Sequence, residues 1–247
     1  MSVYGHDRTP RINKHPFREG YDLPLGRDLL LDGKELLAAL HDEVIAVGFF
    51  DPQYRGILDR QHYGNEGERQ RRRVELPQMS TETIASFLAE LGRVLIPSGH
   101  LFLWLDKFHL CEGTAPWFEG LPLTVVDLVT WDKGKIGMGY RTRRTAEYLL
   151  VLQKEPCRAK GAWTRHDIPD VWHEKATAEA HLRHAHPKPI ELQRALLLST
   201  TSPGEVVVDP AAGSFSVLEA IKGTNRDFLG CDLVTGTTEV GPRKRGA

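Results

Sequence analysis

The feature that most constrains the fold of this chain is a series of short apolar segments that alternate with segments in which leucines recur at helical spacing. Val44–Phe50 and Leu101–Leu105 are apolar throughout, and Glu205–Asp209 has an apolar centre. Continuous apolar runs of this length are typical of strands buried on both faces, as in a parallel sheet between two layers of helices. The alternation therefore predicts an α/β fold with a doubly wound, mostly parallel sheet.

The remaining elements follow from the same periodicities. Three more strands are expected, at Leu123–Trp131, Ala146–Gln153 and Asp227–Asp232. Ser80 or Thr81 can cap a long helix, because apolar residues recur at helical spacing from Ile84 onward. Segments without such periodicity are expected to be irregular: residues 1–26, a mobile loop at 55–78, a turn at Pro97–Gly99, and residues 154–186.

Length and composition limit the kinds of protein this can be. The 247 residues predict a single domain, 1–247, with a core that needs no disulfide to stabilise it. Lys and Arg number 32 and Asp and Glu 33, a net charge of −1, which excludes a polycationic nucleic-acid binder and leaves only local basic patches. The three cysteines form no CxxC pair, which argues against a disulfide framework or zinc site. With no targeting or membrane segment visible, we expect a cytoplasmic protein.

One expected strand end has the features of a cofactor site. The strand that ends at Asp209 leads into a turn of small residues, Pro210–Ser214, and then a helix. Small residues let the backbone approach a ligand closely, and a helix start offers free N–H groups. Asp232 ends the next strand, where a carboxylate can accept hydrogen bonds from ribose hydroxyls. An adenosine-containing cofactor fits this pattern; an ordinary capped helix after a tight turn is the alternative.

A second strand end has the features of a site for an amine on a flat base. Asp51-Pro52-Gln53-Tyr54 follows the strand Val44–Phe50 directly. The carboxylate of Asp51 and the carbonyl of Pro52 can accept the two hydrogens of an exocyclic amine, and the ring of Tyr54 can stack on the base. The alternative is a proline turn beside a surface tyrosine.

Taken together, these motifs resemble those of the amino-group DNA methyltransferases, which use S-adenosylmethionine to methylate adenine N6 or cytosine N4. The D/S/N-P-P-Y motif comes first and the cofactor motif last, which is similar to the circularly permuted order of the β subgroup. The quoted matches are DPQY at 51–54, RTRRTAEYLLVLQK at 141–154, HAHPKP at 184–189, DPAAGSFSV at 209–217, and FLGCD at 228–232. The resemblance covers about residues 28–153 and 184–232 and implies the sheet of S-adenosylmethionine-dependent methyltransferases.

The resemblance implies N6 methylation of a flipped-out adenine in double-stranded DNA, because cytosine enzymes of this type usually carry Ser in place of Asp51. It implies a catalytic group of Asp51, Pro52, Gln53 and Tyr54. It also implies a cofactor site made of Asp32, Phe50, Lys188, Pro189, Asp209, Ala211, Gly213, Ser214 and Asp232. Such an enzyme would act in a restriction-modification setting, at the nucleoid of a bacterium or a phage-infected cell.

The sequence departs from the family pattern at three places. Gln53 replaces the second proline, which frees a backbone N–H and loosens the turn. Phe215 replaces a glycine, so that the cofactor loop must be wider or the ring must pack on the cofactor. His184 and His186 are alternative matches to the histidine before Lys188-Pro189.

Local basic patches are expected to contact DNA phosphates and base edges. Residues 55–73 carry six basic and three acidic side chains, and Lys133–Arg144 carries five basic and no acidic ones. The candidates are Arg55, Arg71, Arg72, Arg73, Lys133, Lys135, Arg141, Arg143 and Arg144. Residues 155–183, which include Trp163, Trp172 and Arg165, occupy the family's target-recognition region. This small insert implies a short recognition sequence or a homodimer in which a second subunit contributes.

Metal binding is not expected, because the histidines between 166 and 186 form no closed ligand set with one another or with a cysteine, apart from the loosely spaced His181, His184 and His186. Other acceptors remain open within the same enzyme class: cytosine N4, an RNA base, or a protein glutamine amide. A non-catalytic DNA-binding regulator that retains the fold is the alternative from another class.

Overall fold

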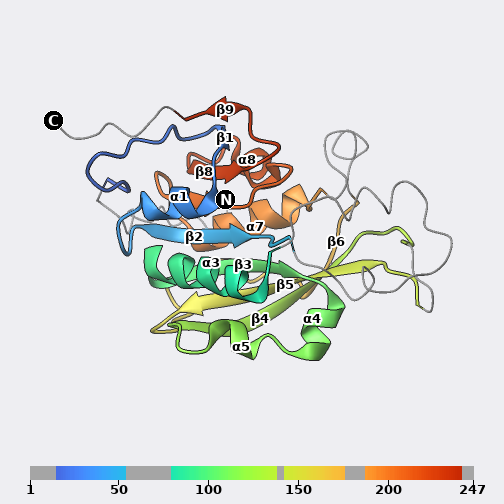
Figure 1. The fold of residues 1–247 in the computed structure, drawn as a ribbon. Coiled ribbons are helices and arrows are strands. Elements are labelled where there is room, and N and C mark those ends of the chain that lie inside the picture. The colour runs from blue at the N-terminus through green and yellow to red at the C-terminus, as the bar shows by residue number, and fades with distance from the viewer. Residues whose placement is uncertain (1–14, 54–78, 138–141, 176–186, 241–247) are drawn as a thin grey trace, which may run out of the picture.

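We describe the fold from a computed structural model, which defines residues 15–53, 79–137, 142–175 and 187–240. These residues contain a nine-stranded sheet with the order β6-β4-β5-β3-β2-β7-β8-β1-β9 (Figure 1). The strands are β1 (Asp28–Leu30), β2 (Ile45–Phe50), β3 (Leu95–Leu105), β4 (Leu123–Asp132), β5 (Ala146–Lys154), β6 (Val171–His173), β7 (Val206–Asp209), β8 (Asp227–Asp232) and β9 (Thr238–Glu239). The helices are α1 (Gly33–Ala38), α3 (Thr81–Val94), α4 (Lys107–Glu112), α5 (Ala115–Phe118), α7 (Ile190–Thr200) and α8 (Ser216–Ile221).

The sheet is mostly parallel, as expected. Only β5 runs against its neighbours, pairing antiparallel with β3 and with β4, while all the other described strand pairs are parallel. Because β2, β3, β7 and β8 point the same way, their carboxyl ends meet at one edge of the sheet. The α/β class and the doubly wound sheet are therefore confirmed.

Two layers of helices cover the two faces of the sheet. Helices α1, α3 and α5 contribute to a hydrophobic core on one face, and α7 and α8 contribute to a second core on the other. Within β2, Ile45 and Phe50 belong to the first core and Val47 and Phe49 to the second, all at most 1% exposed. This burial on both faces explains why the strand has no polar residue.

Several elements differ from the sequence expectation. Strand β3 begins at Leu95, so the expected turn at Pro97–Gly99 lies within the strand, where Ser98 has a φ of 62° and the pairing with β2 is shifted between Ile45 and Val47. Strand β6 lies in a region expected to be irregular. Strands β1, β6 and β9 have two or three residues each, too few to show a periodicity.

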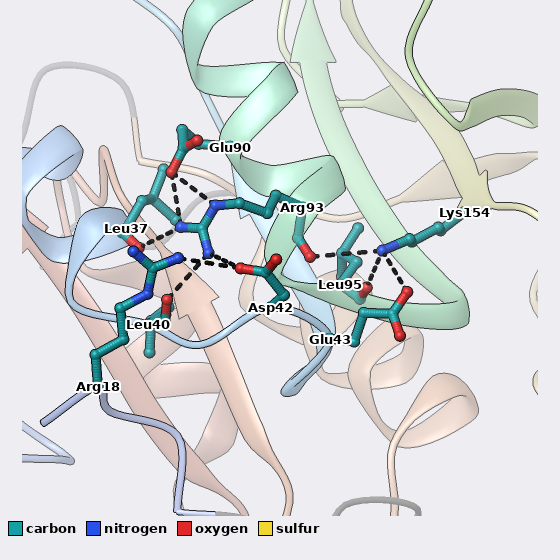
Figure 2. Close-up of polar contacts among 9 residues, drawn as sticks. All are labelled: Arg18, Leu37, Leu40, Asp42, Glu43, Glu90, Arg93, Leu95 and Lys154. Carbon is teal, nitrogen blue, oxygen red and sulfur yellow. Dashed lines mark hydrogen bonds and ion pairs between the residues drawn. The ribbon is translucent and has the colours of Figure 1, made fainter.

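A charged cluster holds the edge of the sheet at which β2 and β3 begin (Figure 2). Arg93, in the last turn of α3, donates hydrogen bonds to the carbonyls of Leu37 and Leu40 at 2.8 and 3.0 Å and pairs with Asp42 at 2.6 Å. Lys154, at the end of β5, donates to the carbonyl of Leu95 at 2.7 Å. These cations satisfy carbonyls at the ends of helices, and the cluster has a structural role.

In the described part of the chain, no helix is long and apolar enough to cross a membrane.

Candidate active site

The two candidate sites of the sequence analysis lie in one cleft. Asp51 follows β2 and Asp209 ends β7, and these strands pair in parallel, with Val47 opposite Val207 and Gly48 opposite Val208. The cleft is lined by Phe49, Phe50, Asp51, Trp104, Lys188, Gln193, Asp209, Ala211, Ala212, Gly213, Ser214, Ser216 and Val217. The strand-end carboxylate of the DPQY motif and the small-residue loop after Asp209 therefore face the same space.

Asp209 is the buried carboxyl of this cleft, 5% exposed. Its side chain accepts a hydrogen bond from the backbone N–H of Ala211 at 3.3 Å. Burial, together with the nearby charges of Asp51 and Asp232, raises the pKa of Asp209 to about 8. A bound positive charge would favour its ionised form, so the cleft is suited to a cationic ligand.

The loop after Asp209 packs against the start of α1. Gly33 lies so close to the carbonyl of Pro210 that an added Cβ would be 2.1 Å from that oxygen. This contact brings Asp32, which caps α1 by accepting from the N–H of Lys34 at 2.8 Å, beside the loop. Burial, together with the nearby carboxyl groups of Asp209, Asp232 and Asp32, raises the pKa of the Cys231 thiol between them. Three carboxyl groups from three separate elements thus lie around Cys231, and Asp209 among them lines the cleft.

Asp232 and Gly213 are held by local hydrogen bonds. The carboxylate of Asp232 accepts from the N–H groups of Val234 and Thr235 at 2.9 and 2.8 Å, which fixes the turn after β8. The hydroxyl of Thr235 donates to the carbonyl of Gly213. The turn after β8 and the loop after β7 are therefore tied together at the edge of the sheet that faces the cleft.

Phe215, which stands where the family pattern has a glycine, is accommodated in a way that the sequence did not predict. Its backbone is left-handed, with a φ of 55°, the conformation that glycine adopts most readily. Its ring is 8% exposed and packs against Phe228 at 6.3 Å between ring centroids, within the core beneath α8. The expected alternatives, a wider loop or a ring against the cofactor, are both replaced by a strained backbone and a core side chain.

A chain of ion pairs leads away from Asp51. The ammonium of Lys188 lies 3.0 Å from Oδ2 of Asp51 and 2.9 Å from Oε2 of Glu147. Oε1 of Glu147 lies 3.1 Å from the ammonium of Lys133. The two lysines lower the pKa of Glu147 to about 2 against the opposing effect of burial, and the carboxylates raise the pKa of Lys188. Glu147 and Lys188 are therefore both charged at neutral pH.

Comparison with known proteins agrees with this geometry. A family model described as DNA methylase, for N6 and N4 methyltransferases, matches residues 50–239. The Type II methyltransferase M.HhaII of Haemophilus parahaemolyticus is 55% identical over 211 residues, which cover 85% of this chain and 91% of that protein. The chain belongs to the N6/N4 DNA methylase family. Its methyl donor is S-adenosylmethionine, as the motifs imply.

Solved structures share the fold of this DNA methylase. The M1.HpyAVI–SAM complex has a TM-score of 0.59 at 16% identity and covers 83% of this chain and 92% of that chain. The PvuII DNA methyltransferase, which is cytosine-N4-specific, has a TM-score of 0.63 at 13% identity, with coverage of 90% and 86%. At these identities the likeness establishes the architecture of the methylase.

The connection between β4 and β5 of the methylase lies at the same edge of the sheet as Asp51. Leu105, at the carboxyl end of β3, is opposite Tyr148 at the start of β5. Of the basic residues expected to bind DNA here, Lys135 and Arg143 are exposed, whereas Arg144 lies over the ring of Phe108 at 5.6 Å. Lys133 points inward to Glu147. The other candidates lie outside the described residues: Tyr54 of the catalytic motif, Arg55, Arg71, Arg72, Arg73 and Arg141.

The tryptophans of the expected recognition region pack on the methylase core. Trp163 contacts His100 and Phe102 with ring centroids 5.6 and 6.5 Å apart, and Trp172 packs against the same core. Arg165 pairs with Asp167 at 2.7 Å. Both tryptophans are thus half-buried and pack against the core beside α7, a structural role for residues in the expected recognition region.

Sequence reasoning assigned no role to Glu147, although this residue was part of a quoted motif. Its signal is a carboxylate near the start of an otherwise apolar strand, in a position opposite Trp131 of β4. Trp104 and Gln193 also line the cleft. Both look like ordinary core positions of β3 and α7 in the sequence, so that no pattern distinguishes them.

Proposed function

We propose that this DNA methylase transfers the methyl group of S-adenosylmethionine to the N6 amine of a flipped-out adenine in double-stranded DNA. The observation that carries the proposal is the shared cleft, in which Asp51 and the loop after Asp209 line one space. Methyl transfer requires the acceptor nitrogen to approach the donor methyl group to about 3–3.5 Å, which two sites on opposite faces could not achieve.

The residues around the cleft fit the methyl donor. S-adenosylmethionine is a cation at its sulfonium and ammonium groups and supplies an electrophilic methyl group. Asp32 and Asp232 provide a matching negative potential, Asp209 can add to it by releasing its proton when the cation binds, and the close approach of Gly33 to Pro210 leaves backbone next to the ligand space. Phe50, Ala211, Gly213 and Ser214 would form its walls, and the buried Pro189 supports α7 beside it.

The acceptor side depends on hydrogen-bond acceptors. The adenine amine is a poor nucleophile because its lone pair is delocalised into the ring. In the proposed mechanism, Asp51 and the Pro52 carbonyl accept the two amine hydrogens and hold the nitrogen lone pair toward the cleft. The nitrogen would gain the methyl group as the sulfonium S–CH3 bond breaks, which leaves S-adenosylhomocysteine, and would then lose a proton to solvent, so that Asp51 need not be a strong base. Tyr54 stacks on the flipped base, contributing about 1–3 kcal/mol by analogy with other base–aromatic contacts.

Adenine is proposed over cytosine because position 51 is Asp, whereas N4-cytosine enzymes of this type usually carry Ser. Cytosine N4 is the second candidate, since its exocyclic amine offers the same two hydrogens. The name of the relative M.HhaII, a Type II methyltransferase, supports a place in restriction-modification.

The test combines calorimetry with product analysis. Wild type, Asp51→Ala and the nearly isosteric Asp51→Asn are titrated with S-adenosylmethionine and then supplied with mixed-sequence DNA and tritiated donor. We expect near-normal donor binding by all three proteins and transfer by the wild type alone. Mass spectrometry of the digested DNA should show N6-methyladenine. N4-methylcytosine would reassign the base, and normal transfer by Asp51→Ala would refute the role of Asp51. Absence of transfer by the wild type would favour the non-catalytic regulator.

A further inference from the structure

The ion pairs at Asp51 suggest a role for Lys188 that differs from the one expected from sequence. Lys188 was expected to bind the cofactor, yet its ammonium lies between two carboxylates, 3.0 Å from Asp51 and 2.9 Å from Glu147. Its side chain is 13% exposed, and its ammonium also lies 5.0 Å from the centre of the Trp104 ring. Two carboxylates and an aromatic face surround this cation, which is therefore committed to protein groups.

The backbone of Lys188 is unusually restricted. It lies between the buried Pro187 and Pro189, so that the following ring disfavours a helical conformation and each proline fixes its own φ. Helix α7 begins at Ile190, directly after Pro189, and the carboxylate of Glu174 accepts from the N–H groups of Glu191 and Leu192, both at 3.0 Å. The base of the Lys188 side chain is thus anchored by the start of a capped helix.

Glu147, the second carboxylate that contacts Lys188, is anchored as well. Glu147 lies in β5, paired in register with Trp131 of β4, and its second oxygen is held by Lys133. The ring of Trp131 lies 6.0 Å below the Lys133 ammonium, and its indole N–H donates to the carbonyl of Glu174 at 2.7 Å. A rigid strand therefore fixes Glu147, which in turn fixes Lys188.

We propose that Lys188 is a positioning residue that orients the carboxylate of Asp51 toward the target amine, and that Glu147 holds Lys188 in place. This inference rests on the proposed function, because it assigns Asp51 the role of amine acceptor. An oriented carboxylate matters because misplacing a reacting group by about 1 Å can reduce a rate by about 100-fold. Glu147 also balances the charge of Lys188, so that the pair does not leave an isolated buried cation beside the cleft.

The test compares Lys188→Met, Lys188→Arg and Glu147→Gln with wild type. Single-turnover rates of methyl transfer, KM for DNA and calorimetric affinity for S-adenosylmethionine are measured. We expect Lys188→Met to lower the transfer rate about 100-fold, with donor affinity changed less than threefold. Lys188→Arg should restore at least a tenth of the rate, because it keeps the cation. Glu147→Gln should lower the rate about tenfold, and its effect should be smaller when Lys188→Met is already present, since both act on one carboxylate.

Lys222→Met is the matched control. Lys222 is 62% exposed and pairs with Glu219 on α8, so that its loss should leave rate and affinity unchanged. Circular dichroism of each variant checks folding, and Glu147→Gln remains informative if Lys188→Met does not fold. A loss of donor affinity with an unchanged saturated rate would overturn the inference and return Lys188 to the cofactor site. Full activity of both Lys188→Met and Glu147→Gln would also overturn it.

Failure of this inference is distinguishable from failure of the proposed function. If wild type methylates DNA and Asp51→Asn does not, the proposed function stands whatever the Lys188 variants do. If Asp51→Asn is as active as wild type, the role of Asp51 falls, and the positioning role of Lys188 falls with it.

Discussion

Gly33 packs directly against the backbone of Pro210, so that a Cβ on Gly33 would lie 2.1 Å from the Pro210 carbonyl oxygen and 2.8 Å from the ring of Phe87. The contact joins the start of α1 to the loop after β7, two segments far apart in the chain. It keeps Asp32 beside the expected donor site.

Gly33→Ala should therefore weaken donor binding and stability together. The clash is with backbone, which cannot move without shifting the Pro210–Ser214 loop. We expect the free energy of unfolding to fall by about 1–3 kcal/mol, a typical effect of overpacking. Calorimetry should show donor affinity reduced at least tenfold.

Gly92→Ala is the control for that variant, because Gly92 lies within α3 and an added Cβ would meet Leu123 at an ordinary 3.5 Å. This change should raise the free energy of unfolding by about 0.5–1 kcal/mol, since alanine restricts the unfolded chain and favours helix. Equal destabilisation by both variants would show that the contact with Pro210 is not special.

The raised pKa of Asp209 predicts that donor affinity depends on pH. The free protein holds a proton on Asp209 up to a pH of about 8, and a bound cation favours the ionised form. Affinity should therefore rise as pH increases toward 8, by up to about tenfold per pH unit, with release of up to one proton. Calorimetry from pH 6 to 9, in buffers of different ionisation enthalpy, measures the donor affinity and the number of protons released. Asp209→Asn should bind more weakly and with a flat pH profile; a sloping profile in that variant would assign the proton elsewhere.

The same carboxyl predicts how stability of the free protein changes with pH. A carboxyl whose pKa is higher in the folded than in the unfolded state binds more protons when folded. Its contribution to the free energy of unfolding therefore falls as pH rises from about 4 to 8. Denaturant titrations of wild type across that range should show this fall, and Asp209→Asn should reduce it.

Phe215 allows backbone strain to be separated from side-chain packing. Phe215→Ala loses the buried ring and keeps a side chain at a φ of 55°, whereas Phe215→Gly loses the ring and relieves the strain. Both should be destabilised, by about 3–5 kcal/mol for alanine and about 1 kcal/mol less for glycine. Thermal unfolding of the two variants measures the difference. Alanine more stable than glycine would show that the left-handed backbone is not strained.

Lys154 should matter for stability and not for catalysis. Lys154→Met removes the donor to the Leu95 carbonyl and the ion pair with Glu43 at 3.1 Å, on the edge of the sheet opposite the cleft. We expect the free energy of unfolding to fall by about 1–3 kcal/mol, because a part-buried carbonyl loses its partner. Denaturant titration should show this, with the methyl-transfer rate unchanged at a temperature where the variant is folded.

Much of the fold was predictable because it depends on periodicity. Strands β2, β7 and β8 have continuous apolar cores, with an acid directly after β2 and at the last position of β7 and β8, and β8 was expected with the bounds it has. Rules for parallel sheets then place Asp51 and Asp209 at one edge. The pairing of Lys188 with Glu147 was not predictable, because it depends on the register of β5 and on the side-chain conformations of residues 41 positions apart. The inward ring of Phe215 was hidden for a similar reason: sequence shows the substitution but not the room beneath α8.

The backbone N–H of Met79 donates to the carbonyl of Gln53 at 2.6 Å, two residues from Asp51. This hydrogen bond joins the chain just after β2 to the residue that precedes Ser80, the N-cap of α3. The end of β2 and the start of α3 are thus held together beside the carboxylate and the carbonyl that are proposed to receive the target amine, so that ordered secondary structure on both sides sets the geometry of these two acceptors.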